Sequence, residues 1–470
     1  MRSRTPRTPA AVRAGLVGAC LILGGAVTAC GRGGTAAGGK SEPVDLSQER
    51  PQERPPVAAA MVAAPAPGAA GADPVAAVAP APADAPAPPA KGGADFVAEA
   101  RLLFQTVACQ GRPQPRDPAH AKVVDRHCTF IDGKLAAYRK RYIVEGRAFF
   151  DELTPDDVPR TVVYPFGGGD LISSLAAFPD ADETTTISLE LAGDPRRIAT
   201  LSTRDLDASL SRLRVELGGT LSVGSNTSVN LSSSQRNDLP AQVSSFLLGL
   251  AAAGFEPVAM RYLRLLDDGS IHYLTADEIA AADGTAATDR GGERGKGAKA
   301  RKGDWKDPNF SEAFAHVEIE YRKVGDPADR VRVHRHFGWN LHDSQLALAP
   351  QLLRHLEQKG KVTVLVKGAS YLLWRSDFSK IRDYLLANLA WMLSDSTGIP
   401  PYYASRAGMV QDTYGHFSGA FLEGAEAHGK RHSADFRALW AKNKKRRLPF
   451  RFGYVDAGKN AHLVVTRPAP

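Results

Sequence analysis

The sequence predicts an α/β protein built on a three-layer, Rossmann-like mixed sheet, and three patterns indicate this fold class. Short apolar runs alternate with helical segments between residues 161 and 395, which is typical of a sheet covered by helices. A glycine turn separates the first of these strands from the first helix. Two apolar runs near the C-terminus, 448–455 and 462–468, predict an antiparallel strand pair that makes the sheet mixed.

Each element follows from its own pattern. Apolar side chains that recur every three or four residues predict helices, and short apolar or alternating runs predict strands. The predicted helices are 96–109, 135–153, 170–178, 205–217, 239–255, 348–360 and 378–395. The predicted strands are 161–166, 184–190 and 361–370, a hairpin over 258–275 with Asp-Gly at its turn, and two strands within 316–341 around Gly-Asp-Pro.

The chain begins with a segment that predicts a lipoprotein signal peptide, residues 1–29. Four arginines precede the apolar run 14–29, which is too short to span a bilayer comfortably. The run ends at VTAC, a pattern typical of bacterial lipoproteins in which the thiol of Cys30 takes the lipid. An ordinary secretory signal or an N-terminal membrane anchor remains an alternative.

Residues 30–94 predict a lipidated cysteine followed by a disordered Pro/Ala/Gly tether. The segment has few large apolar side chains, so it cannot bury enough surface to fold. The rest, 95–470, is expected to form a single large α/β domain with a helical lead-in over 95–155 and a disordered insertion over 280–308. We expect a lipid-anchored envelope protein, in the outer rather than the inner membrane, because Gly31 and not Asp follows the cysteine.

Two cysteines remain in the folded part, and they predict a disulfide. Cys109 and Cys128 close a loop of about 20 residues, and an oxidising compartment outside the cytoplasm favours their pairing. Such a loop contributes roughly 3 kcal/mol of stability. His127 beside Cys128 leaves a thiol catalyst or a metal ligand as the alternative.

The first candidate site is the turn after strand 161–166. Gly167, Gly168 and Gly169 stand where a nucleotide-binding unit lets its backbone approach a ligand, and Glu190 lies at the spacing of a ribose-binding acid. Asp170 replaces the pattern's later glycine, and its charge opposes a pyrophosphate. The turn therefore predicts either an α/β scaffold without a nucleotide or, in a class I methyltransferase-like core, a nucleoside site.

A second candidate follows the apolar strand 361–370. Lys367 ends this strand, Ser370 and Tyr371 come directly after it, and Asp395 is a possible counter-ion. Such a set could perform acid–base or acyl chemistry. The alternative is a structural lysine at a helix C-terminus. An open cleft shared by Lys367, Glu190 and the glycine turn would favour an enzyme, whereas a buried pair of Asp170 with Lys367 would not.

A third candidate is a metal site. His334 and His336 alternate along a predicted strand and share one face, with His342 and Asp343 close by in the sequence. Imidazole pairs of this kind hold zinc or iron. The alternative is a polar face whose histidines are hydrogen-bonded.

The formal net charge of +8 favours an anionic partner. The basic residues are concentrated in two clusters, over 290–302 and over 442–447. Neither cluster is interleaved with aromatic residues as a single-strand nucleic-acid site would be. Nucleic acid is therefore not the expected partner, and both clusters are interpreted as solvated surface.

The blocks YPFGGGDL, FPDA, SLELAGDPRR, KGASYLL, FSKIRDYLL, DSTGIPPYY and LPFRFGY resemble a family of uncharacterised bacterial secreted proteins and lipoproteins, of the myxobacterial type. The resemblance covers most of 95–470. It implies one continuous domain and an envelope location, and it assigns no activity, cofactor or catalytic residue.

These observations predict a membrane-anchored envelope lipoprotein that binds an envelope partner or a glycan. An envelope enzyme that uses a pocket near Gly167–Asp170 is one alternative. A methyltransferase-like fold that binds a nucleoside is another.

Overall fold

The computed structural model describes residues 91–111, 116–221, 238–291, 311–417, 427–450, 452 and 461–470. They belong to one compact unit of the chain, 86–470. The predicted signal peptide, Cys30 and nearly all of the predicted tether lie outside the described residues.

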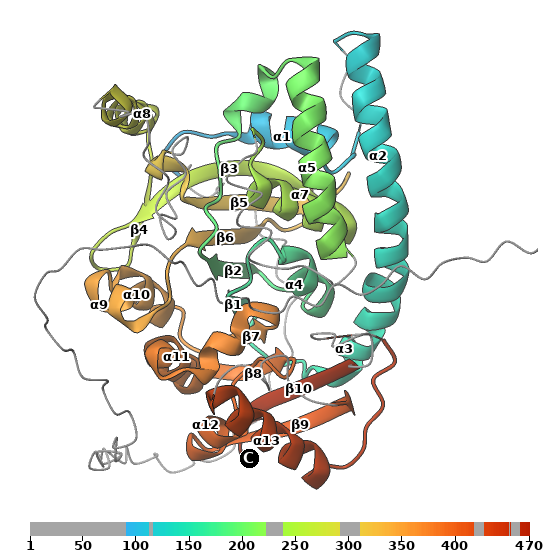
Figure 1. The fold of residues 1–470 in the computed structure, drawn as a ribbon, viewed down its shortest axis with the longest axis vertical. Helices are drawn as coiled ribbons and strands as arrows, with labels where there is room; N and C mark the ends of the chain where they lie inside the picture. Colours follow the sequence, from blue (N-terminus) through green and yellow to red (C-terminus); the bar gives the residue numbers. More distant parts are fainter. Residues whose placement is uncertain are drawn as a thin grey trace, which may run out of the picture. The chain divides into compact units, whose positions relative to one another are not determined.

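Ten strands form one mixed sheet in the order β4-β3-β5-β6-β2-β1-β7-β8-β10-β9 (Figure 1). The strands from β6 to β8 pair in parallel, and the strands beyond them on both sides pair antiparallel. They are β1 (Thr161–Pro165), β2 (Glu183–Ser188), β3 (Phe255–Leu265), β4 (Ile271–Tyr273), β5 (His316–Lys323), β6 (Arg332–Gly338), β7 (Val362–Val366), β8 (Leu389–Ser394), β9 (Met409–His416) and β10 (Ala461–Pro468). The predicted mixed α/β class is confirmed.

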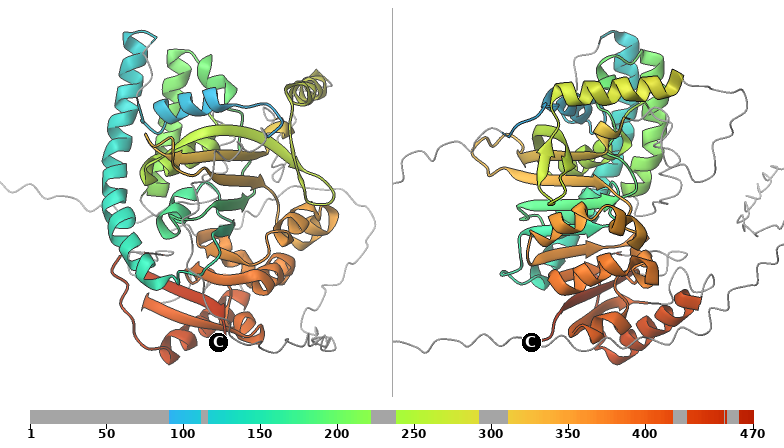
Figure 2. Two further views of the ribbon diagram at one scale, coloured as in Figure 1. Left: turned by 180° about the vertical axis from the view of Figure 1, so that it is seen from behind. Right: turned by 90° about the vertical axis from the view of Figure 1, so that its left-hand side faces the viewer.

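Residues 95–155, where the sequence predicts helices, hold four consecutive helical segments. They are α1 (Val97–Thr106), α2 (Pro118–Tyr138), a π-helical segment η2 (Arg139–Gly146) and α3 (Arg147–Leu153). The carboxylate of Asp117 accepts the backbone N–H of His120 at 2.7 Å and so caps α2, with Pro118 at the first helical position. The long helix α2 runs beside α5 (Figure 2).

The central strands separate two apolar clusters, because their side chains alternate between the two faces of the sheet. Val162 and Tyr164 on β1 pack with residues of α1, α2, α4, α5 and α7, whereas Val163 packs with residues of α9 to α12. The remaining helices are α4 (Leu171–Ala177), α5 (Thr203–Leu221), α7 (Ala241–Ala253), α8 (Ala276–Gly291), α9 (Asp343–Leu348), α10 (Gln351–Glu357), α11 (Ser379–Asn388), α12 (Pro401–Arg406) and α13 (Ala427–Lys442).

The predicted long helix over 378–395 is wrong in its second half. Helix α11 ends at Asn388, whose side-chain amide donates to the Tyr384 carbonyl at 2.9 Å, and the run LAWMLS forms strand β8. A short apolar run is compatible with either a buried helix or a buried strand, so periodicity cannot separate them. The segment is a strand because it pairs with β7 on one side and with β10 on the other.

The C-terminal antiparallel pair exists, but one of its strands lies elsewhere than predicted. Strand β10 pairs with β9 (Met409–His416), and the described residues of 448–455 form no strand. Phe450 and Phe452 are buried against Phe150 instead. The sequence of β9 alternates weakly because it is an edge strand, half-buried along most of its length.

Part of the segment predicted to be disordered, 280–308, is helical. Helix α8 extends to Gly291, and the remainder lies outside the described residues. The backbone N–H of Thr275 donates to Glu278, and the N–H of Glu278 donates to the Thr275 hydroxyl. This capping box and the alanines that follow favour a helix.

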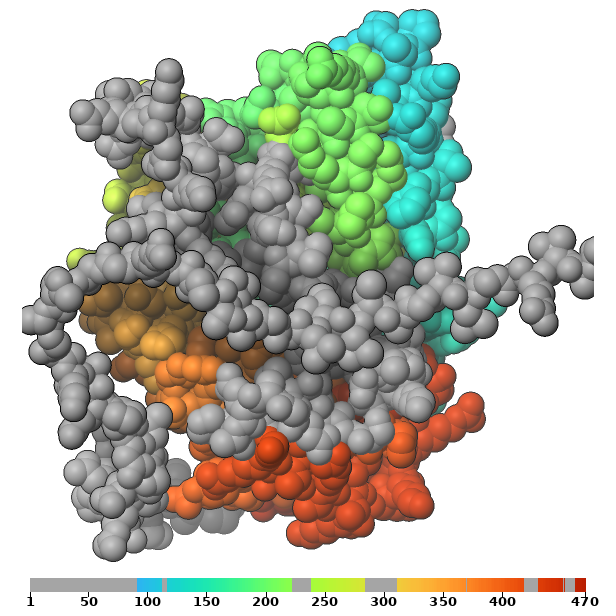
Figure 3. Space-filling model, viewed as in Figure 1, coloured from blue at the N-terminus to red at the C-terminus, as the bar shows by residue number. Residues whose placement is uncertain are grey.

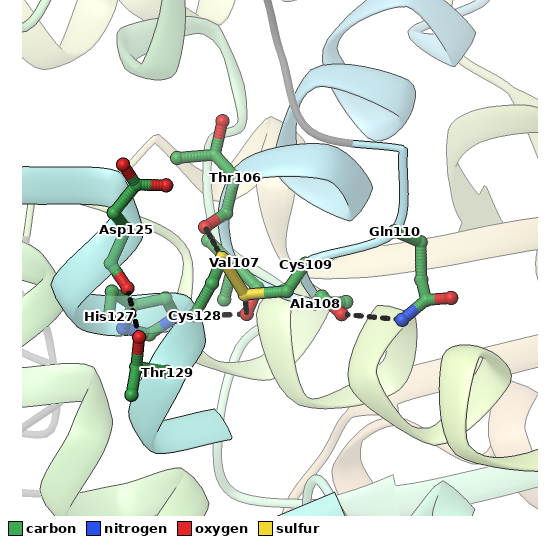
Figure 4. Close-up of a disulfide and its surroundings, with 9 residues drawn as sticks. All are labelled: Thr106, Val107, Ala108, Cys109, Gln110, Asp125, His127, Cys128 and Thr129. Atoms are coloured by element: carbon green, nitrogen blue, oxygen red, sulfur yellow. Dashed lines mark hydrogen bonds between the residues drawn. A yellow bond between two sulfur atoms is a disulfide. The ribbon is translucent and has the colours of Figure 1, made fainter. Parts of the chain in front are cut away.

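The predicted disulfide is confirmed. Cys109, in the loop after α1, is bonded to Cys128 on α2 (Figure 4). Cys128 is fully buried, and its neighbour His127 is bonded through Nε2 to the Val107 carbonyl at 2.9 Å. The bond therefore joins α1 to α2 at the start of the domain. No helix among the described residues is both long enough and apolar enough to cross a bilayer.

Candidate functional site

Three neighbouring parallel strands, β2, β1 and β7, end at the same edge of the sheet. The predicted site residues follow these strand ends directly. The glycine turn comes after β1, Glu190 comes after β2 and Lys367 comes after β7. The sheet thus brings together three groups that are far apart in the sequence.

The turn between β1 and α4 is tightly bound to β2. The backbone N–H of Gly167 donates to the Ile187 carbonyl at 3.1 Å. The preceding residue, Phe166, has a φ of 60°. Backbone strain of this kind in a bulky residue costs about 1–3 kcal/mol and is concentrated at functional sites.

Two of the three glycines are required by internal packing. A Cβ on Gly167 would lie 2.8 Å from the Tyr164 ring, and a Cβ on Gly169 would lie 2.7 Å from Ser245 of α7. Gly168 is different, because the nearest neighbours of a Cβ at this position would be the carboxyl atoms of Glu190, at 3.8–3.9 Å. Only Gly168 therefore has room for a side-chain carbon on the side of the predicted acid, and its φ of 51° is what favours glycine there.

Glu190 lies beside the glycine turn, as its spacing in the sequence suggests. It is 6% exposed. Burial raises the pKa of its carboxyl group, and its polar neighbours are the Ser188 side chain and its own backbone N–H. No basic side chain among the described residues forms an ion pair with it. A buried acid without a counter-charge is unfavourable for the fold and marks a candidate functional group.

Lys367 forms its ion pair with Asp170, not with Asp395 as predicted. Its Nζ lies 2.8 Å from the Asp170 carboxylate and donates to the Ser173 hydroxyl at 2.6 Å. The same carboxylate accepts from the Tyr164 hydroxyl at 2.9 Å and from Ser173 at 2.8 Å. The side chains of Lys367 and Asp170 are 18% and 19% exposed. Asp170 thus precedes α4 but uses its carboxylate for this network instead of capping the helix.

Asp395 and Ser370 stabilise the turn after β7. The Asp395 carboxylate accepts from the backbone N–H groups of Thr397 at 2.8 Å and Gly368 at 3.3 Å. The Ser370 hydroxyl is fully buried and bonded to the Thr397 hydroxyl at 2.6 Å. Tyr371 follows in the 3-10 helix η5 (Gly368–Trp374). The predicted Lys-Ser-Tyr-Asp set is therefore two separate groups, because the chain turns sharply at Gly368, whose φ is 72°.

His334 and His336 are both fully buried, and a threonine lies between them. The Thr186 hydroxyl is 2.9 Å from Nε2 of His334 and 3.0 Å from Nδ1 of His336. Nε2 of His336 lies 2.7 Å from the carbonyl oxygen of Glu190, so this nitrogen carries a proton and Nδ1 accepts from Thr186. Burial lowers the pKa of His336 to about 4, so the neutral ring is the form present at neutral pH.

The other members of the predicted metal set lie elsewhere. His342 pairs with Asp377, and Asp343 accepts the backbone N–H groups at the start of α11. Among the described residues, no three His, Cys, Asp or Glu side chains are grouped as metal ligands. The geometry of His334 and His336 is that of a hydrogen-bonded pair inside the sheet layer.

The sequence analysis missed three polar residues of this region. Tyr164 and Ser173 bind Asp170 from β1 and α4, and Thr186 joins the two histidines. Ser173 lies three residues after Asp170, the residue that precedes α4, and this spacing places the two side chains on the same side of the helix start. That signal was present in the sequence. Thr186 gave none, because its partners come from another strand.

A cavity of about 400 Å³ opens elsewhere, at the N-terminal end of β1. Arg160, Phe178 and Asp180 are among the residues that line it. None of the predicted site residues lines this cavity.

No protein-family model, curated protein or solved structure matches this chain in the comparisons.

Proposed function

We propose that this chain is a lipid-anchored binding protein of the bacterial cell envelope, in which the α/β domain recognises a hydroxyl-rich ligand at the edge formed by β2, β1 and β7. The sequence supports the anchor, through the apolar run that ends at Cys30. The observation that carries the binding site is Glu190, a buried acid that forms no ion pair with a basic side chain of the described residues and lies beside Gly168 of the glycine turn.

The strand order supports a Rossmann-like, three-layer core. From β1 the chain proceeds to β2 on one side, and it later adds β7 and β8 on the other. In open α/β sheets, ligands bind outside the carboxyl ends of the strands where the order reverses in this way. The position of β10, antiparallel between β8 and β9, resembles a class I methyltransferase-like core, in which an acid after the second strand binds ribose hydroxyls.

The chemistry of the edge favours a ligand with neighbouring hydroxyl groups, such as a glycan or a nucleoside. A carboxylate can accept two hydrogen bonds from such a pair. Lys367 adds a donor: an ammonium group has three N–H bonds, and Asp170 and Ser173 take two of them. The enzyme alternative has less support, because Asp170 and Lys367 form an ion pair with one another.

The Glu190→Gln variant tests the site. Burial raises the folded-state pKa of Glu190, so its stabilising contribution is complete below the unfolded pKa of about 4.3 and is lost as the pH rises through the folded pKa. The variant is therefore expected to unfold at a higher urea concentration than the wild type near pH 7. This gain should disappear near pH 4, and the variant should lose the thermal shift that the ligand gives the wild type.

The thermal shift is measured with four ligands: S-adenosylmethionine, its demethylated product, NAD and a peptidoglycan disaccharide. A shift with the disaccharide alone supports a glycan, and a shift with the adenosine compounds supports a nucleoside. The exposed Glu357→Gln change on α10 is the matched control and should leave both readouts unchanged. No shift with any probe, together with no stability gain in Glu190→Gln, contradicts the site.

The Cys30→Ser variant tests the anchor separately. Without the thiol the lipid cannot be attached, so the protein is expected to move from the membrane fraction to the soluble fraction of the cells. An uncleaved signal would add the mass of residues 1–29 to the product, which mass spectrometry detects. Continued detergent-dependent extraction of a Cys30→Ser product that has the mass of the cleaved chain would show that lipid on this residue is not the anchor.

A further inference from the structure

A strongly basic surface lies at the end of α13 and in the segment that follows it. Lys442, Lys444, Lys445 and Arg447 are all exposed, and we call these four residues the basic strip. They belong to the C-terminal part of the chain, drawn in red in Figure 3. The sequence analysis interpreted this cluster as solvated surface.

The structure holds the backbone of the basic strip along the edge strand β9. The Asn443 side-chain amide donates to the Gln411 carbonyl at 2.9 Å. The Arg446 guanidinium donates to the Asp412 carboxylate at 2.8 Å, and the Arg446 carbonyl accepts from the backbone N–H of Gly415 at 2.9 Å. Because Asn443 and Arg446 point towards the sheet, the basic residues between and beside them remain on the outside.

The four charges of the strip are not neutralised. No carboxylate among the described residues pairs with Lys442, Lys444, Lys445 or Arg447, and α13 adds the exposed Lys430. The acid of α13 is Asp435, and its carboxylate is bonded to the ring of His432. Like charges crowded into six residues repel one another, and no contact within the described domain offsets that cost.

Edge protection alone does not account for this arrangement. Lysines on an edge strand prevent pairing with another chain, but here the charges stand on a segment that already covers β9. We propose that the basic strip binds an anionic lipid surface and so orients the domain on the membrane. Each lysine or arginine near such a surface contributes about 1 kcal/mol, and a polybasic patch is the usual second signal beside a lipid chain.

The test uses residues 31–470, so that neither an acyl group nor the apolar run 14–29 contributes, and measures co-sedimentation with vesicles. Phosphatidylcholine vesicles that contain phosphatidylglycerol should bind the protein, and added sodium chloride should weaken that binding. Replacing Lys442, Lys444 and Lys445 together with glutamine should raise the dissociation constant about 100-fold.

The matched control carries Lys122→Gln, Lys134→Gln and Lys140→Gln, three exposed changes along α2 and η2 that alter the net charge equally. It should bind nearly as well as its parent, and both triple variants should keep the parent's thermal midpoint. Equal losses in the two variants would show an effect of net charge and overturn the proposal. Equal binding to pure phosphatidylcholine, or tighter binding to a double-stranded oligonucleotide than to anionic vesicles, would overturn it as well.

Discussion

Replacing Arg335 with methionine is expected to lower the free energy of unfolding by about 3 kcal/mol. The Arg335 guanidinium lies between two acids: it donates to Glu318 at 2.7 Å and also pairs with Glu183. The side chain of Glu318 is fully buried. Burial by itself raises the pKa of Glu183, but the charges of Lys359 and Arg335 outweigh it and lower that pKa to about 2. Without Arg335, Glu318 keeps only Lys91 as a cationic partner and Glu183 keeps only Lys359, and both acids lose their hydrogen bonds to the guanidinium.

Urea unfolding near pH 7 measures this effect. The control is Arg126→Met, which breaks an ion pair with Asp207 whose side chains are 53% and 39% exposed. An exposed pair of this kind contributes at most about 1 kcal/mol. Adding Glu318→Gln to Arg335→Met should restore part of the loss, since it removes the charge of one of the two buried acids that have lost the guanidinium. A loss for Arg335→Met no greater than that for Arg126→Met would contradict the assigned role.

The second large effect is acid destabilisation, which we expect to amount to several kcal/mol between about pH 7 and about pH 5. Burial lowers the pKa of His127, His336 and His355 to about 4 in each case. Burial also lowers the pKa of His334. In the unfolded chain a histidine has a pKa of about 6.5. Between these values the unfolded chain binds protons that the folded chain does not.

The sign follows from this difference in proton binding. The stability that these histidines provide is complete above about pH 6.5 and is lost as the pH falls towards about 4. A shift from about 6.5 to about 4 costs about 2 kcal/mol per histidine at about pH 5. Glu190 changes the stability in the opposite direction, because its pKa is raised. The four histidines together have the larger effect.

The His127→Gln variant measures the contribution of one of these histidines to the pH dependence. Glutamine can still donate to the Val107 carbonyl, which Nε2 of His127 reaches at 2.9 Å, but it does not titrate. The change in the free energy of unfolding between about pH 7 and about pH 5, measured in urea, should be about 2 kcal/mol smaller in the variant. A wild-type stability that is constant over this range would show that the histidines are not held neutral.

The helical lead-in and most elements of the sheet could be predicted from the sequence, because helices and strands leave local periodic signals. The boundary between α11 and β8 could not. LAWMLS is apolar throughout apart from its final serine, and its pairing with β7 and β10 comes from strands elsewhere in the chain. The same applies to β9, whose mixed side chains reflect an edge position that only the completed sheet defines.

The candidate site divides in the same way. The sequence by itself determined that Cys109 and Cys128 could pair and that Glu190 follows the glycine turn at the spacing of a binding acid, because both relations are short-range. Only the tertiary structure decided that Lys367 pairs with Asp170, that Asp395 closes a turn, and that His334 and His336 are buried around Thr186. Those partners lie on separate strands or in the turns that follow them, so their contact depends on the order of strands in the sheet, which no local pattern records.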